Sequence, residues 1–227
     1  VTFRSSTFLS CYTNYYGGAL YANEGARIRS VGLTFRSCSV YNYGGALYLK
    51  SSAQADLESS LFEDCSNTGY STGYSRGGAA YLEDYAVLTA TTTTFRSNSA
   101  TYGGGLYAIS TSTVSLVGCT FTSNTALYDG GGAVVNSGSS ISARGTTFKA
   151  CSASRKGGGL QVTSSSTVVV EGSSFESCRV SEDYGGGLFV GSTSTGSVHW
   201  SNFTNNSAPW GAGLCAYSST VHVSGSR

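Results

Sequence analysis

Eight phenylalanines recur along this chain of 227 residues at a nearly constant spacing. Each is followed three positions later by Cys or Asn, and then by a glycine-rich corner that leads into an aliphatic residue. A fixed period in the twenties indicates a solenoid, because a short repeat cannot bury its own apolar face and must stack on its neighbours. The successive intervals are 27, 27, 33, 26, 27, 27 and 28 residues, between Phe8, Phe35, Phe62, Phe95, Phe121, Phe148, Phe175 and Phe203.

The segments between these signals predict β-strands. They are rich in β-branched residues and alternate with a period of two, as in 27–31, 87–89, 113–117, 167–170 and 197–200. Further short strands are expected at each phenylalanine and after the glycines, as in 47–50. We therefore expect an all-β, parallel β-helix of about eight rungs of ~27 residues, forming a single domain over residues 1–227.

Composition argues against several partners. The net charge is +1, and only 11% of the residues are charged, so the chain lacks the basic surface that nucleic acid or an anionic membrane requires. Residues 1–227 show neither the pattern of a signal peptide nor an apolar run of the roughly 20 residues needed to cross a bilayer. We expect no nucleic-acid partner and no direct membrane insertion.

Two features concern the length of the array. The long third interval contains the Gly/Ser/Tyr tract 66–75, which is expected to bulge out as a loop. The chain starts and stops at the same phase of its repeat and shows no capping unit. We therefore expect a segment of a longer repeat array, or a unit that stacks end to end on copies of itself.

The phenylalanines are expected to face inward as an aromatic core, and the residues that follow them to face outward. Two outward pairs on adjacent rungs have opposite charges, Arg36 with Glu63 and Lys149 with Glu176. Such cross-strand pairs set the register of a sheet and contribute little else.

The third position after each phenylalanine forms a corner ladder. Asparagine there can build an amide ladder or bond to turn backbone, and cysteine can act as a small buried hydrophobe. Free buried thiols, one or two disulfides between rungs, and a metal site remain open, although a spacing of 27 fits no zinc-ligand pattern and neither metal nor cofactor is expected. The ladder is Cys11, Cys38, Cys65, Asn98, Asn124, Cys151, Cys178 and Asn206.

The glycine pairs are interpreted as corners with positive φ, since they lack the lysine and the helix of a phosphate loop. After them we expect inward aliphatic residues, among them Leu47, Leu106 and Val134, with Val135 outward. In the third rung the residues around Thr91 and Thr94 are rich in threonine, but no regular threonine array is expected across the rungs.

Two aromatic columns flank these corners. Because Leu47 and Leu49 are expected to face inward, Tyr48 and its equivalents should form an exposed stripe on the outside. The stripe could stack on sugar rings or dock a partner, or the tyrosines could simply stabilise an exposed sheet. One column contains Tyr21, Tyr48, Tyr81 and Tyr107, and the other contains Tyr16, Tyr43, Tyr102, Tyr184 and Trp210.

No catalytic residues are expected, because His199 and His222 occupy different phases of the repeat and the acidic residues are scattered. The chain is therefore predicted not to be an enzyme. Two N-glycosylation sequons begin at Asn202 and Asn205, which favours secretion.

The paired motifs resemble the repeats of chlamydial polymorphic membrane proteins, which also occur in secreted surface proteins of other microbes and algae. The resemblance is carried by Gly-Gly-Ala-Leu at 17–20 and 44–47, and by Phe-x-x-Asn at 95–98, 121–124 and 203–206. It implies a right-handed parallel β-helix that is displayed at a cell surface and is often adhesive. Cysteine replaces the motif's asparagine in five of the eight rungs.

These observations predict a non-enzymatic extracellular module, structural or adhesive, at the cell surface. Its expected partners are flanking repeats, other copies of the chain, or glycans and proteins of a cell surface. The alternative is a carbohydrate-binding solenoid that uses the tyrosine stripe.

Overall fold

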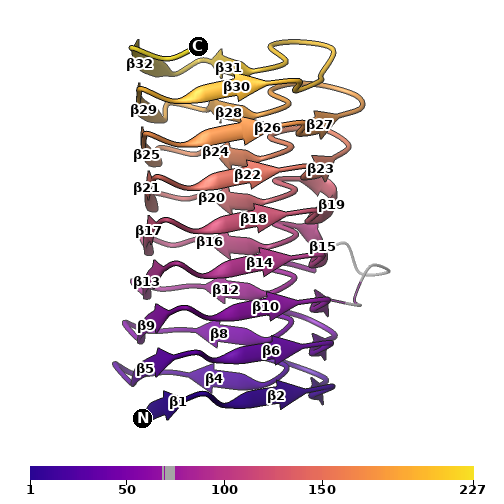
Figure 1. Ribbon diagram of the computed structural model, residues 1–227, viewed down its shortest axis with the longest axis vertical. Coiled ribbons are helices and arrows are strands. Elements are labelled where there is room, and N and C mark those ends of the chain that lie inside the picture. The colour runs from indigo at the N-terminus through magenta and orange to yellow at the C-terminus, as the bar shows by residue number, and fades with distance from the viewer. Residues whose placement is uncertain (68, 70–74) are drawn as a thin grey trace.

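The computed structural model describes residues 1–67, 69 and 75–227 as a stack of similar coils of β-strands, with the two termini at opposite ends (Figure 1). The strands form four sheets, here A to D, and every pairing between neighbouring strands is parallel. In the described part of the chain no helix is long and apolar enough to cross a membrane.

Sheets A and B follow each other along each coil. Within the described residues, sheet A has nine strands: β1 (Thr2–Arg4), β5 (Arg27–Val31), β9 (Gln54–Glu58), β13 (Val87–Thr91), β17 (Thr113–Val117), β21 (Ser140–Arg144), β25 (Thr167–Glu171), β29 (Thr195–His199) and β32 (Thr220–Ser224). Sheet B has eight: β2 (Thr7–Leu9), β6 (Thr34–Arg36), β10 (Leu61–Glu63), β14 (Thr94–Arg96), β18 (Thr120–Thr122), β22 (Thr147–Lys149), β26 (Ser174–Glu176) and β30 (Asn202–Thr204).

Sheets C and D complete the coil. The described strands of sheet C are β3 (Tyr12–Thr13), β7 (Ser39–Val40), β11 (Ser66–Asn67), β15 (Ser99–Tyr102), β19 (Thr125–Asp129), β23 (Ser152–Ala153) and β27 (Arg179–Val180). Those of sheet D are β4 (Leu20–Ala22), β8 (Leu47–Leu49), β12 (Ala80–Leu82), β16 (Leu106–Ala108), β20 (Ala133–Val135), β24 (Leu160–Val162), β28 (Leu188–Gly191) and β31 (Leu214–Tyr217). The predicted β-solenoid of about eight turns of about 27 residues is confirmed.

The phenylalanines form one aromatic stack inside the coils. Phe35 pairs with Phe62 in register, and the centroids of their rings lie 4.6 Å apart. From Phe8 to Phe203 all seven neighbouring pairs are stacked, with centroids 4.5–5.4 Å apart. The six phenylalanines from Phe35 to Phe175 are fully buried. The predicted inward column is therefore confirmed.

Loss of a central ring should be costly. We expect Phe121→Ala to lower the free energy of unfolding by about 3 to 5 kcal/mol, because the cavity lies between two stacked rings. Phe8 is only partly buried, so Phe8→Ala is the matched control with a smaller loss. Urea denaturation followed by circular dichroism measures both, and equal losses would contradict the stack's role.

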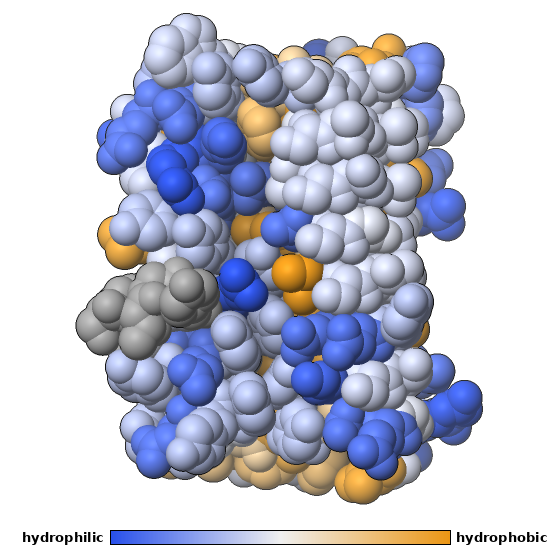
Figure 2. Space-filling model, turned by 180° about the vertical axis from the view of Figure 1, so that it is seen from behind, coloured by the Kyte–Doolittle hydropathy of each residue, from blue (hydrophilic) through white to orange (hydrophobic). Residues whose placement is uncertain are grey.

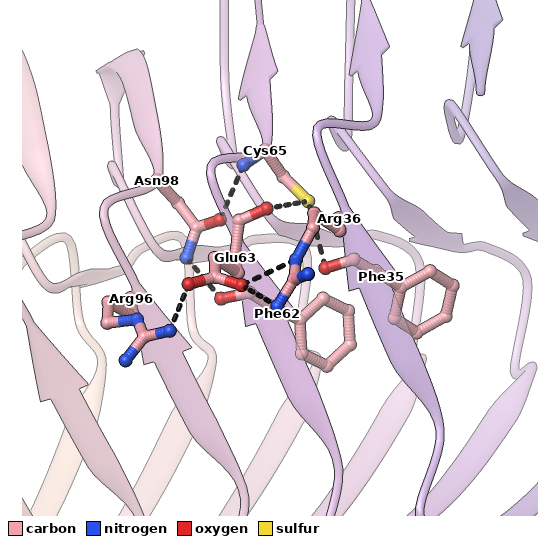
Figure 3. Close-up of polar contacts among 7 residues, drawn as sticks. All are labelled: Phe35, Arg36, Phe62, Glu63, Cys65, Arg96 and Asn98. Atoms are coloured by element: carbon pink, nitrogen blue, oxygen red, sulfur yellow. Dashed lines mark hydrogen bonds and ion pairs between the residues drawn. The ribbon is translucent and has the colours of Figure 1, made fainter. Parts of the chain in front are cut away.

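The corner between sheets B and C is held by side chains that bond to backbone (Figure 3). Asn98 donates from Nδ2 to the carbonyl of Phe62 in the preceding coil at 3.1 Å, and its Oδ1 accepts from the backbone N–H of Cys65 at 2.9 Å. The thiol of Cys65 likewise donates to the carbonyl of Phe35 at 3.7 Å. Cysteine therefore keeps the donor role that asparagine has in this ladder, through a weaker donor.

A second ladder, which sequence analysis missed, lies at the bend between sheets A and B. The hydroxyl oxygens of Ser60, Ser173 and Ser201 accept hydrogen bonds from the backbone N–H groups of Leu33, Thr146 and Ser173 in the preceding coils, at 3.0–3.3 Å. Cys119 lies at the equivalent bend, next to Gly118, which has φ +59°. Cys119 therefore belongs to this bend and not to the corner ladder.

The predicted charge pairs are present on the outer face of sheet B. The carboxylate of Glu63 lies 2.6 Å from Nη2 of Arg36 and also contacts Arg96 on the other side (Figure 3). Nζ of Lys149 lies 3.1 Å from Oε1 of Glu176. The hydrogen bond from Arg96, together with that from Arg36, holds the pKa of Glu63 below its usual value although burial opposes this.

The lowered pKa predicts a pH-dependent contribution to stability. Glu63 stabilises the fold above the unfolded-state pKa of a glutamate, about 4.3, and this contribution is lost as the pH falls through the lower folded-state pKa. We expect Glu63→Gln to cost about 1 to 3 kcal/mol at pH 7 and much less at pH 3. Glu176→Gln is the control, since Glu176 pairs with a single cation of the described residues, Lys149, on an exposed surface. Denaturation curves at both pH values give these differences, and a cost for Glu63→Gln that is the same at both would contradict the assignment.

Three expectations need correction or limitation. Ala133 pairs with Leu106, so Val134 faces outward and Val135 inward, the reverse of the prediction. Gly130, Gly131 and Gly132 are consecutive, so the sequence does not show which of them forms the corner. The positive φ falls on Gly130 (φ +67°), one residue earlier than the prediction assumes. Five threonines do share the row of sheet B that precedes the phenylalanines, but Leu61, Ser174 and Asn202 interrupt it, so no regular array spans all the rungs. The threonines are Thr7, Thr34, Thr94, Thr120 and Thr147. The expected loop 66–75 lies mostly outside the described residues.

Candidate functional site

The outer face of sheet D carries the first predicted tyrosine column. Tyr48, Tyr81 and Tyr107 do point away from the main core, because they form a separate cluster with Val134. They are nevertheless buried, with Tyr48 only 1% exposed, so the prediction of an exposed stripe is wrong for these three residues. Tyr21, at 49% exposure, fits the prediction.

The second column explains this burial. Its residues precede the glycine corners and pair from coil to coil through isolated bridges, as Tyr43 does with Arg76 and Arg76 with Tyr102. Their side chains lean over the first column: the ring of Tyr43 stacks on that of Tyr81 at 4.9 Å, and the guanidinium of Arg76 lies 5.4 Å from the ring centroid of Tyr107. A sequence period places residues on a face but does not reveal how far one column covers the next.

Where the second column turns from aromatic to charged, the face is hollowed. The hollow has a volume of about 280 Å³ and spans four successive coils. In Figure 2, which shows the molecule from behind, strongly hydrophilic and apolar residues lie close together in the middle of this face. The lining residues are Arg76, Tyr102, Tyr107, Asp129, Val134, Asn136, Gln161 and Thr163.

Only one of the two carboxylate oxygens of Asp129, which lines the hollow, has a hydrogen-bond partner among the described residues. Asp129 accepts from Nη2 of Arg155 through Oδ2 at 3.0 Å, whereas its Oδ1 is buried without a hydrogen-bond partner. Burial raises the pKa of Asp129, and the positive charges of Arg155 and Lys156 offset part of that effect. Arg155 in turn lies over the ring of Tyr128, with its guanidinium carbon 4.3 Å from the centroid.

Arg76 is the other charged group of the hollow. Its Nε is also buried without a hydrogen-bond partner, and none of the ion pairs in the described part of the chain includes it. Burial alone would lower the pKa of Arg76, but the tyrosine hydroxyls around it, first those of Tyr107 and Tyr81, raise it overall. The guanidinium therefore stays charged and keeps free hydrogen-bonding capacity.

Exposed aromatic residues lie on the same face on both sides of the hollow. Towards the N-terminus, Tyr16 stacks on Tyr21 at 6.0 Å, and both are exposed. Towards the C-terminus, the ring of Tyr184 lies 5.1 Å from Trp210 and 5.7 Å from Tyr217, and these two are 55% and 57% exposed. Tyr217 was not singled out from the sequence, since it lies in a different column from the predicted ones.

The two sequons lie near the corner between sheets B and C. Asn205 is exposed at the positive-φ position of that corner, with φ 54°. Asn202 is half-buried in β30, and its Oδ1 accepts from Nε of Arg227 at 3.2 Å. Asn205 is therefore the more accessible acceptor.

All seven cysteines are free thiols in the structure, and the described residues contain no cluster of His, Cys, Asp and Glu that would hold a metal ion. Cys11 and Cys215 are half-buried, and the other five are buried. Burial raises the pKa of Cys119, which keeps its thiol protonated and unreactive.

Thiol titration tests this arrangement. Without reductant, we expect a thiol reagent to modify all seven cysteines of the denatured protein, and no more than Cys11 and Cys215 of the folded protein. The variant Cys215→Ser should lower the count in the folded protein by one if this thiol reacts. Fewer than seven thiols after denaturation would reveal disulfides between rungs.

Comparison with known proteins agrees with this geometry. A family model described as a right handed beta helix region matches residues 1–148 and 71–227, which together cover the chain. No curated protein matches the sequence. The chain belongs to this right-handed β-helix family, which includes both enzymes and proteins without catalytic activity.

Proposed function

We propose that the protein is a non-enzymatic extracellular scaffold, a rigid β-helical module that adheres to its partners at a cell surface through its outer faces. The observation that carries this proposal is the uninterrupted stack from Phe8 to Phe203. It joins the coils into one body and holds outward side chains at a constant spacing. A fixed spacing of contacts suits attachment at several points at once.

The exposed sequon at Asn205 supports an extracellular location, because glycosylation requires an accessible acceptor on a secreted chain. Antibodies raised against the folded protein test the location directly. We expect them to label intact cells of the source organism, or its extracellular matrix, without permeabilisation. Labelling that appears only after permeabilisation would contradict the proposal, as would turnover of any polysaccharide in a substrate panel.

Carbohydrate binding is the second candidate, and the face of sheet D favours it. Exposed aromatic rings at its two ends, Tyr16 and Tyr21 on one side and Trp210 and Tyr217 on the other, suit stacking on sugar rings. The polar hollow between them offers hydrogen bonds to hydroxyl groups. The buried Tyr48, Tyr81 and Tyr107 would support these rings rather than touch a ligand.

A glycan array with two tryptophan variants tests this candidate. We expect the protein to bind a subset of glycans and Trp210→Ala to weaken that binding by about tenfold, since an exposed ring would be lost from the face. Trp200→Ala is the matched control, because Trp200 is also exposed but lies at the bend between sheets A and B. Equal effects of the two substitutions would argue against the face of sheet D.

A further inference from the structure

We propose that the hollow on sheet D binds the carboxylate-bearing ring of an acidic sugar, with Arg76 as the residue that recognises the carboxylate. This inference rests on the carbohydrate-binding candidate for its ligand class, and on the geometry of the hollow for its charge preference.

The guanidinium of Arg76 is the cation that the ligand's carboxylate would meet. Arg76 lies between two aromatic rings, with its guanidinium carbon 5.9 Å from the centroid of Tyr43 and 5.4 Å from that of Tyr107. These contacts fix the plane of the guanidinium, yet they leave Nε without a hydrogen-bond partner. Arg36 and Arg155 each form an ion pair with a carboxylate, whereas none of the ion pairs in the described part of the chain includes Arg76. A planar, fixed guanidinium is best matched by a carboxylate, which can accept two parallel hydrogen bonds.

The free acceptor is on Asp129. Its Oδ1 has no partner, while Oδ2 is held by Arg155. A buried carboxylate oxygen without a donor is costly, and a ligand hydroxyl would satisfy it. Arg155 and Lys156 lie near Asp129, and Asp183 adds a second negative charge there, so with Arg76 the three cations outnumber these two carboxylates. This balance favours an anion in the hollow.

The floor suits a ring of this size. Val134 and the ring of Tyr107 supply apolar contact, whereas Gln161 brings an amide into a column that is aromatic or aliphatic in the neighbouring coils. Asn136 already donates to the hydroxyl of Tyr107 at 3.1 Å, which holds that side of the hollow in place. At about 280 Å³ the hollow is at the lower limit of small-molecule sites, so it has room for one ring rather than a long chain.

Titration calorimetry with methyl glucuronide and its neutral counterpart, methyl glucoside, tests the inference. We expect saturable binding of the glucuronide, about tenfold or more weaker binding of the glucoside, and a similar loss for the glucuronide with Arg76→Gln. Arg144→Gln is the control, because it removes one positive charge from sheet A, away from the hollow. Its affinity should stay that of the unaltered protein.

A second measurement covers the case in which the arginine variant does not fold. If Arg76→Gln unfolds, as judged by circular dichroism, the salt dependence of binding replaces it, since affinity that rests on a charge pair falls as salt rises. Equal affinity for the two sugars, or no binding of either by the folded protein, would overturn the inference. Neutral glycans bound through Trp210 with no preference for the glucuronide would leave the carbohydrate-binding candidate standing and reject only the role of Arg76.

Discussion

The structure depends on the stacking of identical positions from successive coils. Because strands pair in parallel and in register, each side chain lies beside the side chain of the same phase in the next coil. In that arrangement the favourable residues are those that pack well against the same residue type in the next coil. These are flat aromatic rings in the core, and hydroxyl, thiol and amide groups at the bends. The repeat is therefore a direct consequence of the fold's geometry.

The same constraint makes the departures from the repeat informative. The column before the glycine corners is mostly aromatic. It has charged residues instead at Arg76 and then at Asp129 and Lys156. At those coils the face of sheet D becomes hollow and polar, and buried polar atoms of Arg76, Asp129 and Arg155 have no hydrogen-bond partner. On the outer face of sheet B, by contrast, charged residues of adjacent coils pair with each other, as Glu63 does with Arg36 and Arg96. The hollow thus differs from the regular surface, where the repeat pairs one coil with the next.

Much of the fold could be predicted from the sequence, because a period and an alternation pattern determine which residues share a column and which face inward. This pattern predicts the stacking of Phe35 on Phe62 and the pairing of Arg36 with Glu63, and the structure has both. The site was harder to predict. The burial of Tyr48 depends on how neighbouring columns lean, and the register at Val134 depends on which of three glycines takes the positive φ. The spacing of the repeat determines neither the burial of Tyr48 nor the register at Val134.

Energetic coupling between phenylalanines one coil apart tests the central claim most directly. In a double-mutant cycle with leucine substitutions, Phe121 and Phe148 should show a coupling energy of about 0.5 to 1.5 kcal/mol, the range for packed aromatic pairs. Phe95 and Phe175, which are separated by two other rings, should give additive effects. Additive effects for the adjacent pair would show that positions 27 residues apart do not stack, and would contradict the account.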